Sequence, residues 1–314
     1  MKEQVDFGLL LGQDILSAGY SQQEPSKNYD VKFATWLMVD KEICERDARY
    51  AAYRIGKVMR EYGAFFILVF ILSLPFLAVG AMSDLALPLG LPIAALMFPC
   101  PLIAASILVY REEGRDGVKR LLKRVFDHKR IRKKAWYAAI FFLLPAIYLL
   151  SYAIMYLMGT PLPNPLSPVL LPLLFIIFFI AAACEEAGWT GYATDPLQAK
   201  WTALGAGIII GIIWAAWHVI PDIQAGQAWD YILWERCNTV FLRVLMVWIY
   251  NNAGRSVFSV VVVHAMINVS FFTLFPKAGY YAPAVTAMLV AAVAVLAASL
   301  WGPRTLAKYR FGRK

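Results

Sequence analysis

The chain has 314 residues, of which 60% are hydrophobic and only 16% are charged, and its formal net charge is +9. Soluble domains carry about 25% charged residues, and the mean hydropathy here is +0.58. The composition therefore excludes an ordinary soluble domain and predicts an integral membrane protein. Since the basic residues gather between apolar segments, the positive charge does not imply a nucleic-acid partner.

Residues 1–62 are mixed in polarity and differ from the rest of the chain. Their early apolar run, "FGLLLG", is too short for the core of a cleavable signal peptide. We predict a cytoplasmic N-terminal extension over 1–62 and a single transmembrane domain over 63–314.

Eight later segments are apolar for long enough to cross about 30 Å of hydrocarbon. They predict an all-α fold, a polytopic membrane bundle of about eight transmembrane helices. The second segment contains four prolines, which predict a kink, and the sixth contains Arg236 and Arg243. The expected spans are 63–83, 86–110, 135–158, 168–192, 202–221, 234–251, 256–275 and 281–302.

The basic residues predict the orientation. Eleven Lys or Arg lie in the segment 111–134 and five in the tail 303–314, whereas Lys277 is the one basic residue in the loops expected on the other side. The positive-inside rule then places both termini and the 111–134 loop in the cytoplasm. At the membrane surface, this loop is expected to contact the anionic head groups of the lipid bilayer.

A few polar side chains lie within the apolar segments. An acid or a base at the centre of a membrane helix costs about 2.5–3.5 kcal/mol on insertion scales, so such residues face a protein interior or a wet cavity. Each one alone could be a hydrogen-bonding link between helices. Together they supply a carboxylate base, imidazoles and an amide donor, which are the groups that a hydrolytic site needs. The candidate site residues are Glu185, Glu186, His218, His264 and Asn268.

Helical spacing sorts these residues by face. His264 and Asn268 are four residues apart and share one face, as do Trp214 and His218. A small-residue pair, Gly207 with Gly211, lies one turn before Trp214 on the same face and predicts a close approach of another helix.

The two glutamates cannot face the same point, because adjacent helical residues are rotated by about 100°. Glu185 stacks over Gly188, whose missing side chain is expected to leave room for a substrate. Glu186 points toward Thr190. Glu185 lies near the cytoplasmic end of the fourth span and His218 near the outer end of the fifth. They meet only if the fourth helix continues past Asp195, or if residues 196–206 enter the membrane.

Three short motifs resemble those of one family. "EEAGWTGY" (185–192), "WAAWH" (214–218) and "HAMIN" (264–268) are similar to the motifs of the type II CAAX prenyl proteases, also called the CPBP family of CAAX proteases and bacteriocin-processing enzymes. The resemblance covers about 168–275. One position departs from the family pattern, because Thr190 stands where the family usually has an Arg that would anchor a glutamate.

The resemblance implies an intramembrane endopeptidase of the glutamate type. Glu185 would act as the base that activates water with His218, and His264 and Asn268 would stabilise the oxyanion, with Glu186 in a supporting role. It also implies a membrane-bound peptide or protein substrate, prenylated or not, and no cofactor.

Three alternatives remain open from the sequence. Glu with two His is also a zinc-binding set, so a zinc-dependent protease is one of them. The Thr190 departure favours a second, a non-enzymatic immunity or regulatory protein of the same fold. A third is a transporter with a proton relay, although the chain shows no inverted repeat.

Overall fold

The structure, a computed structural model, describes residues 63–83, 86–276 and 281–307. The expected N-terminal extension, 1–62, lies outside the described residues. Almost all of the described chain is helical, and its strands are β1 (Ala86–Leu87) and β2 (Leu91–Pro92), which form a short antiparallel pair.

Seven helices are long and apolar enough to span a membrane, which confirms the polytopic helical bundle. They are Gly63–Ala81, Ile93–Arg124, Trp136–Leu157, Pro168–Lys200, Ala203–Gln224, Val257–Leu274 and Pro283–Trp301. The sixth expected span, 234–251, corresponds to α9 (Trp229–Asn252). Its 24 residues give a length of about 36 Å, but it does not meet the apolar criterion, because it carries Asp230, Glu235, Arg236 and Arg243.

The second expected span, 86–110, differs from the prediction at both ends. Its proline-rich start forms β1, β2 and two 3-10 turns, η1 (Pro88–Gly90) and η2 (Ile93–Met97), before α3 (Cys100–Arg124) begins. Proline has no backbone N–H to donate to the hydrogen bonds of a regular helix, which explains the irregular start. The helix then continues through the first half of the segment predicted as the loop 111–134.

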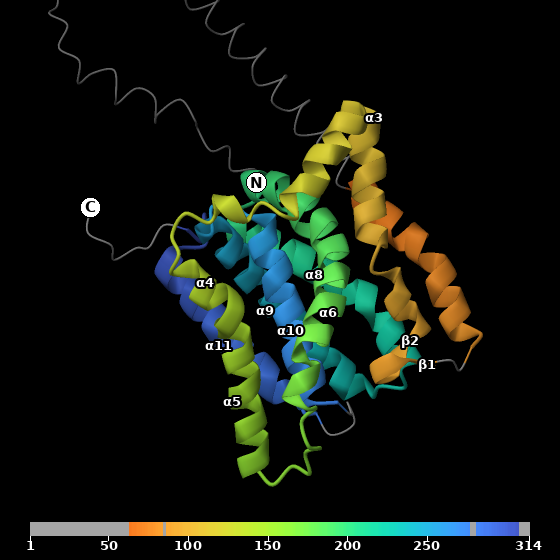
Figure 1. The fold of residues 1–314 in the computed structure, drawn as a ribbon, viewed down its shortest axis with the longest axis vertical. Helices are drawn as coiled ribbons and strands as arrows, with labels where there is room; N and C mark the ends of the chain where they lie inside the picture. The colour runs from red at the N-terminus through yellow and green to blue at the C-terminus, as the bar shows by residue number, and fades with distance from the viewer. Residues whose placement is uncertain (1–62, 84–85, 277–280, 308–314) are drawn as a thin grey trace, which may run out of the picture. The chain divides into compact units, whose positions relative to one another are not determined.

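A single glycine turns α3 back on itself. Gly114 has φ 62° and ψ −157°, a conformation that residues with a side chain rarely adopt, and Figure 1 shows two legs of α3 diverging from this point. We call 100–113 the first leg and 115–124 the second leg. Leu121 on the second leg is buried while Lys119 and Lys123 are exposed. The basic segment is therefore amphipathic, which is why it folds as a helix.

The fourth span is part of a longer continuous helix. It comprises η5 (Pro168–Leu170), α6 (Leu171–Gly188), the π-helical turn η6 (Trp189–Thr194) and α7 (Asp195–Lys200). The helix thus runs past Asp195, which is one of the two conditions for Glu185 to meet the fifth span. π-helical turns are rare and frequently occur at functional sites, and this one directly follows the paired glutamates.

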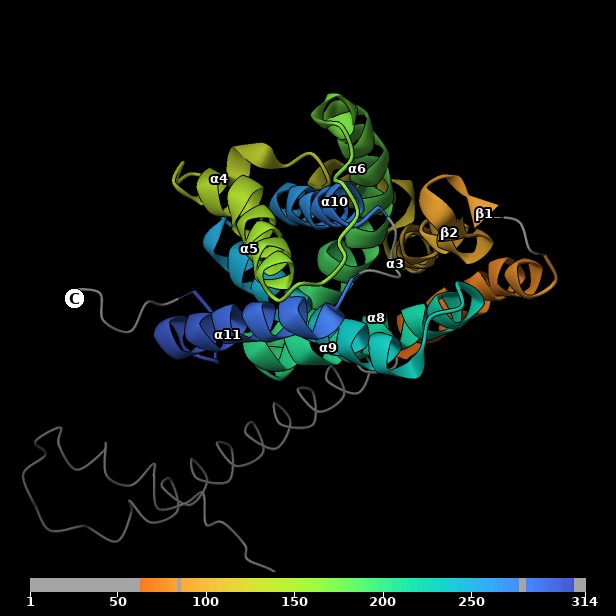
Figure 2. The same cartoon turned by 90° about the horizontal axis from the view of Figure 1, so that it is seen from below.

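The remaining helices surround α10 (Val257–Leu274). Figure 2 shows α10 between α6 and α5 (Leu144–Leu157), with α9 and α8 (Ala203–Gln224) along one side. The short α4 (Trp136–Ala138) and η4 (Ala139–Leu143) precede α5, η3 (His128–Arg130) follows α3, and α11 (Pro283–Trp301) packs on α9 and α5. Twelve of the eighteen residues of α10 are buried, as expected for the centre of a bundle.

The small-residue pair on α8 has the predicted role. A Cβ atom added to Gly207 would lie 3.2 Å from the Cα of Val244, and one added to Gly211 would lie 2.9 Å from the Cα of Val240. Both neighbours are backbone atoms of α9. The absence of two side chains therefore sets the separation of α8 and α9.

We predict that Gly211→Ala lowers the stability of the bundle. The added methyl group collides with the backbone of α9, and overpacking of this kind costs about 1–3 kcal/mol. Thermal unfolding of the purified protein in detergent measures the change. Gly63→Ala is the matched control, because a Cβ there meets no heavy atom within 4 Å. An equal melting temperature for both variants would contradict the close contact.

Candidate active site

Four helices contribute the polar residues of the candidate site. Glu185 and Glu186 lie at the end of α6, Trp214 and His218 on α8, and His264 and Asn268 on α10. Arg243 on α9 joins them. Figure 1 shows α6, α8, α9 and α10 gathered in the middle of the bundle. The predicted residues therefore come from helices that pack together, although they are far apart in the chain.

A buried ion pair holds α6 to α9. The guanidinium of Arg243 donates two hydrogen bonds to the carboxylate of Glu186, from Nη1 to Oε2 at 2.7 Å and from Nη2 to Oε1 at 2.9 Å. Both side chains are completely buried. A bidentate ion pair of this kind is strong and geometrically specific, so it fixes the position of Glu186.

Two further residues complete the surroundings of Glu186. His264 on α10 places Nδ1 3.0 Å from Oε1, and the hydroxyl of Thr190 donates to Oε2 one turn along the helix. The spacing in the sequence predicted the direction toward Thr190. Both carboxylate oxygens of Glu186 thus have two partners each, and this side chain has little capacity left for a further ligand.

Trp214 is a common neighbour of Glu185, Arg243 and His264. Its indole Nε1 donates to Oε2 of Glu185 at 3.0 Å. The Arg243 guanidinium carbon lies 4.5 Å from the centre of the Trp214 ring, a cation–π contact. The His264 ring packs edge-on against the same indole with centroids 5.2 Å apart. One aromatic side chain therefore positions Glu185 relative to Arg243 and His264.

A backbone carbonyl determines which ring nitrogen of His218 carries the proton. Its Nδ1 lies 2.9 Å from the carbonyl oxygen of Trp214, and a carbonyl can only accept a hydrogen bond. Nδ1 therefore carries the proton, and in the neutral ring Nε2 is an acceptor. The rings of Trp214 and Trp217 contact His218 edge-on and hold its orientation.

Asn268 shares a face of α10 with His264, one turn further along. Its side chain is half-buried and takes no part in the hydrogen bonds between the described residues. Its amide is thus available to a ligand, but the described residues show no hydrogen bond between Asn268 and the other candidate residues.

The expected role of Gly188 is wrong. A Cβ atom at this position would lie 2.6 Å from the carbonyl oxygen of Pro101, so the space is filled by the first leg of α3. The small residue permits close packing of α6 against α3 and does not leave room for a substrate.

The described residues hold no group of three His, Cys, Asp or Glu side chains placed to share a metal ion. Glu185, His218 and His264 all lie within the described residues. In the same part of the chain Cys100, Cys184 and Cys237 are unpaired.

Arg243 is the functional residue that the sequence motifs missed. It lies outside all three motifs, 53 residues after Thr190 in the chain. The sequence did contain a signal for it. An arginine within an apolar segment is costly, so it is expected to pair with a buried acid. In the sequence, Arg243 stands out only as one of two arginines in the sixth expected span.

Comparisons with known proteins agree with the motifs. Residues 167–270 match the family described as type II CAAX prenyl endopeptidase Rce1-like. A protein from Methanococcus maripaludis named CAAX prenyl protease 2 is 29% identical over 187 residues, which cover 54% of this chain and 68% of the relative. The segment that carries Glu185, Glu186, His218, His264 and Asn268 therefore resembles the type II CAAX prenyl endopeptidases, as its three motifs predict.

Proposed function

We propose that this protein is an intramembrane endopeptidase in which Glu185 is the general base. The observation that carries the proposal is that the two glutamates have different hydrogen-bonding surroundings. Glu186 is enclosed by Arg243, His264 and Thr190. Among the described residues, Glu185 is hydrogen-bonded by Trp214 through one oxygen, which leaves the other oxygen for water.

His218 supports the activation of water. Its Nε2 is left free of the Trp214 carbonyl and can accept a hydrogen bond, so it can hold the water whose proton Glu185 removes. Removal of that proton produces the nucleophile at the peptide carbonyl. Because Trp214 contacts both Glu185 and His218, a single rigid indole sets the geometry of this pair.

His264 and Asn268 are suited to stabilise the oxyanion. With Nδ1 of His264 donating to Glu186, Nε2 can donate to an oxyanion when the ring is in the imidazolium form. The free amide of Asn268 supplies a second donor from the same helix face. Preorganised donors of this kind stabilise developing charge strongly in a site that excludes water.

The resemblance to the prenyl endopeptidases supports a membrane-associated peptide or protein as the substrate. The printed name of the relative, CAAX prenyl protease 2, supports a prenylated peptide as the first substrate to assay. Cleavage requires no metal in this proposal, because the acid and the histidines act through hydrogen bonds.

The non-enzymatic alternative rested on the missing arginine at position 190. Arg243 supplies a guanidinium to Glu186 from another helix, and Thr190 contributes a hydrogen bond to the same carboxylate. The departure from the family pattern thus has a structural compensation, and it no longer favours an inactive protein.

We predict that Glu185→Gln reduces turnover of a quenched prenyl-peptide substrate by about 10²- to 10⁴-fold, the contribution of a general base. The melting temperature should stay within a few degrees of the parent, since glutamine retains an acceptor for Trp214. Glu113→Gln on the exposed side of α3 is the control. Full activity of Glu185→Gln would refute the proposed base. Loss of parent activity in a chelator, with recovery on adding zinc, would favour the zinc-dependent alternative.

We predict that Arg243→Met and Glu186→Gln each destabilise the bundle, because each leaves a buried group of the pair without its partner. Removal of one member of a buried ion pair costs about 3–5 kcal/mol. The double variant should recover much of this loss, and thermal unfolding of all four proteins measures the coupling. Additive losses in the double variant would show that the pair is not coupled.

We further propose that the termini and the basic segment 111–134 face the cytoplasm. Single cysteines at Lys129 and Asn164, both exposed, are introduced into a chain from which the native cysteines have been removed. The positions flank the span Trp136–Leu157, so they lie on opposite sides. In intact cells an impermeant thiol reagent should label position 164 and spare position 129. Labelling of position 129 alone would reverse the orientation.

A further inference from the structure

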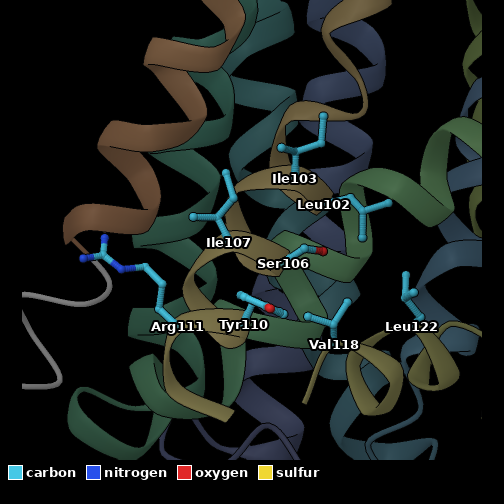
Figure 3. Close-up of a pocket in the computed structure, with 8 residues that line it drawn as sticks. All are labelled: Leu102, Ile103, Ser106, Ile107, Tyr110, Arg111, Val118 and Leu122. Atoms are coloured by element: carbon cyan, nitrogen blue, oxygen red, sulfur yellow. The ribbon is translucent and has the colours of Figure 1, made fainter. Parts of the chain in front are cut away.

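The two legs of α3 line a shallow open groove that the proposed chemistry does not use. Its volume is about 540 Å³. Figure 3 shows Leu102, Ser106 and Ile107 along the first leg, and Val118 and Leu122 on the second leg across from them. The lining is almost entirely apolar, and its polar groups are the side chains of Ser106, Tyr110 and Arg111.

Both walls of the groove are fixed to the bundle. On the first leg, Pro101 packs against Gly188 of α6. On the second leg, Arg124 donates hydrogen bonds to the carbonyl of Gly191, at 2.6 Å, and to the hydroxyl of Tyr250, at 2.6 Å. The groove is therefore present before any ligand arrives, which lowers the cost of binding.

The dimensions of the groove match one leaflet of a bilayer. From Leu102 to Arg111 the first leg rises about 14 Å at 1.5 Å per residue. Half of the hydrocarbon thickness is about 15 Å. Arg111 stands at the end of this apolar stretch, three residues before the turn at Gly114. In a helix that crosses the bilayer, Arg111 would therefore lie about one leaflet's depth from Leu102.

Arg111 offers an unneutralised charge at that end. Its side chain is exposed, and in the described part of the chain it is not among the ion pairs. Nearby Lys119 and Arg120 are instead paired with Asp116 and Glu113. An apolar groove of one leaflet's depth that ends at an exposed cation is complementary to an acyl chain bearing an anionic head group.

We propose that the groove between the legs of α3 binds one anionic phospholipid, with an acyl chain along Leu102–Ile107 and the phosphate on Arg111. The site is separate from the glutamates and does not depend on the proposed peptidase activity. Since the second leg also holds the carbonyl of Gly191 through Arg124, the bound lipid would brace the helix turn that follows Glu186.

Native mass spectrometry of the full chain in detergent tests this proposal. Dioleoyl phosphatidylglycerol and dioleoyl phosphatidylcholine are titrated separately, so that the acyl chains are identical and the head-group charge differs. The parent should retain one phosphatidylglycerol more tightly than phosphatidylcholine. Arg111→Gln should weaken phosphatidylglycerol binding about fivefold, the equivalent of the roughly 1 kcal/mol that one basic residue contributes at an anionic surface, and leave phosphatidylcholine binding unchanged.

Two further variants separate the groove from general surface charge. Ser106→Trp fills the groove and should weaken the binding of both lipids, whereas Lys119→Gln, an exposed and already paired residue, should change neither. Melting temperatures verify that each variant is folded, and Arg111→Gln alone suffices if Ser106→Trp does not fold.

The proposal is overturned if the parent binds both lipids equally, if Lys119→Gln weakens binding as much as Arg111→Gln does, or if the folded Ser106→Trp binds like the parent. Displacement of the retained phosphatidylglycerol by farnesyl-cysteine methyl ester would also overturn it, because the groove would then belong to an isoprenyl chain.

Discussion

The ion pair between Arg243 and Glu186 is the interaction on which the rest of the site depends. Two charges with no exposed surface are costly in a membrane domain unless each satisfies the other. The pair joins the end of α6 to the middle of α9, and it also engages His264 on α10. Three helices are thereby brought to one point by a requirement of electrostatics, and hydrophobic packing alone would not specify that point.

Trp214 extends this arrangement to the catalytic candidates. Its indole lies over the Arg243 guanidinium, donates to Glu185 and contacts His264. The close approach of α8 to α9 at Gly207 and Gly211 permits this contact, because a larger residue would separate the two helices. The two glycines of α8 thus help to place Trp214 in the polar site.

The helix that carries the glutamates is shaped for the same purpose. It continues through a π-helical turn, Trp189–Thr194, immediately after Glu186. Arg124, from the second leg of α3, binds the carbonyl of Gly191 within that turn. The basic segment is therefore more than a determinant of orientation, because one of its arginines, Arg124, binds the element beside the site, and another, Arg111, lines the groove between the legs of α3.

The sequence by itself determined the class of protein and most of the candidate site. Long apolar segments can only be satisfied in a bilayer as helices, so the bundle and most of its spans were predictable. The 3.6-residue period placed Glu186 toward Thr190 and paired His264 with Asn268 on one face, because these relations are local.

Tertiary structure decided what depends on distant residues. The sequence could not show that Arg243 takes the place of the expected arginine at position 190, since the two lie 53 residues apart and meet only when α9 packs on α6. Nor could it show that Pro101 fills the space above Gly188, or that Gly114 reverses α3. Each depends on which helices become neighbours, and uniformly apolar segments carry little information about their partners.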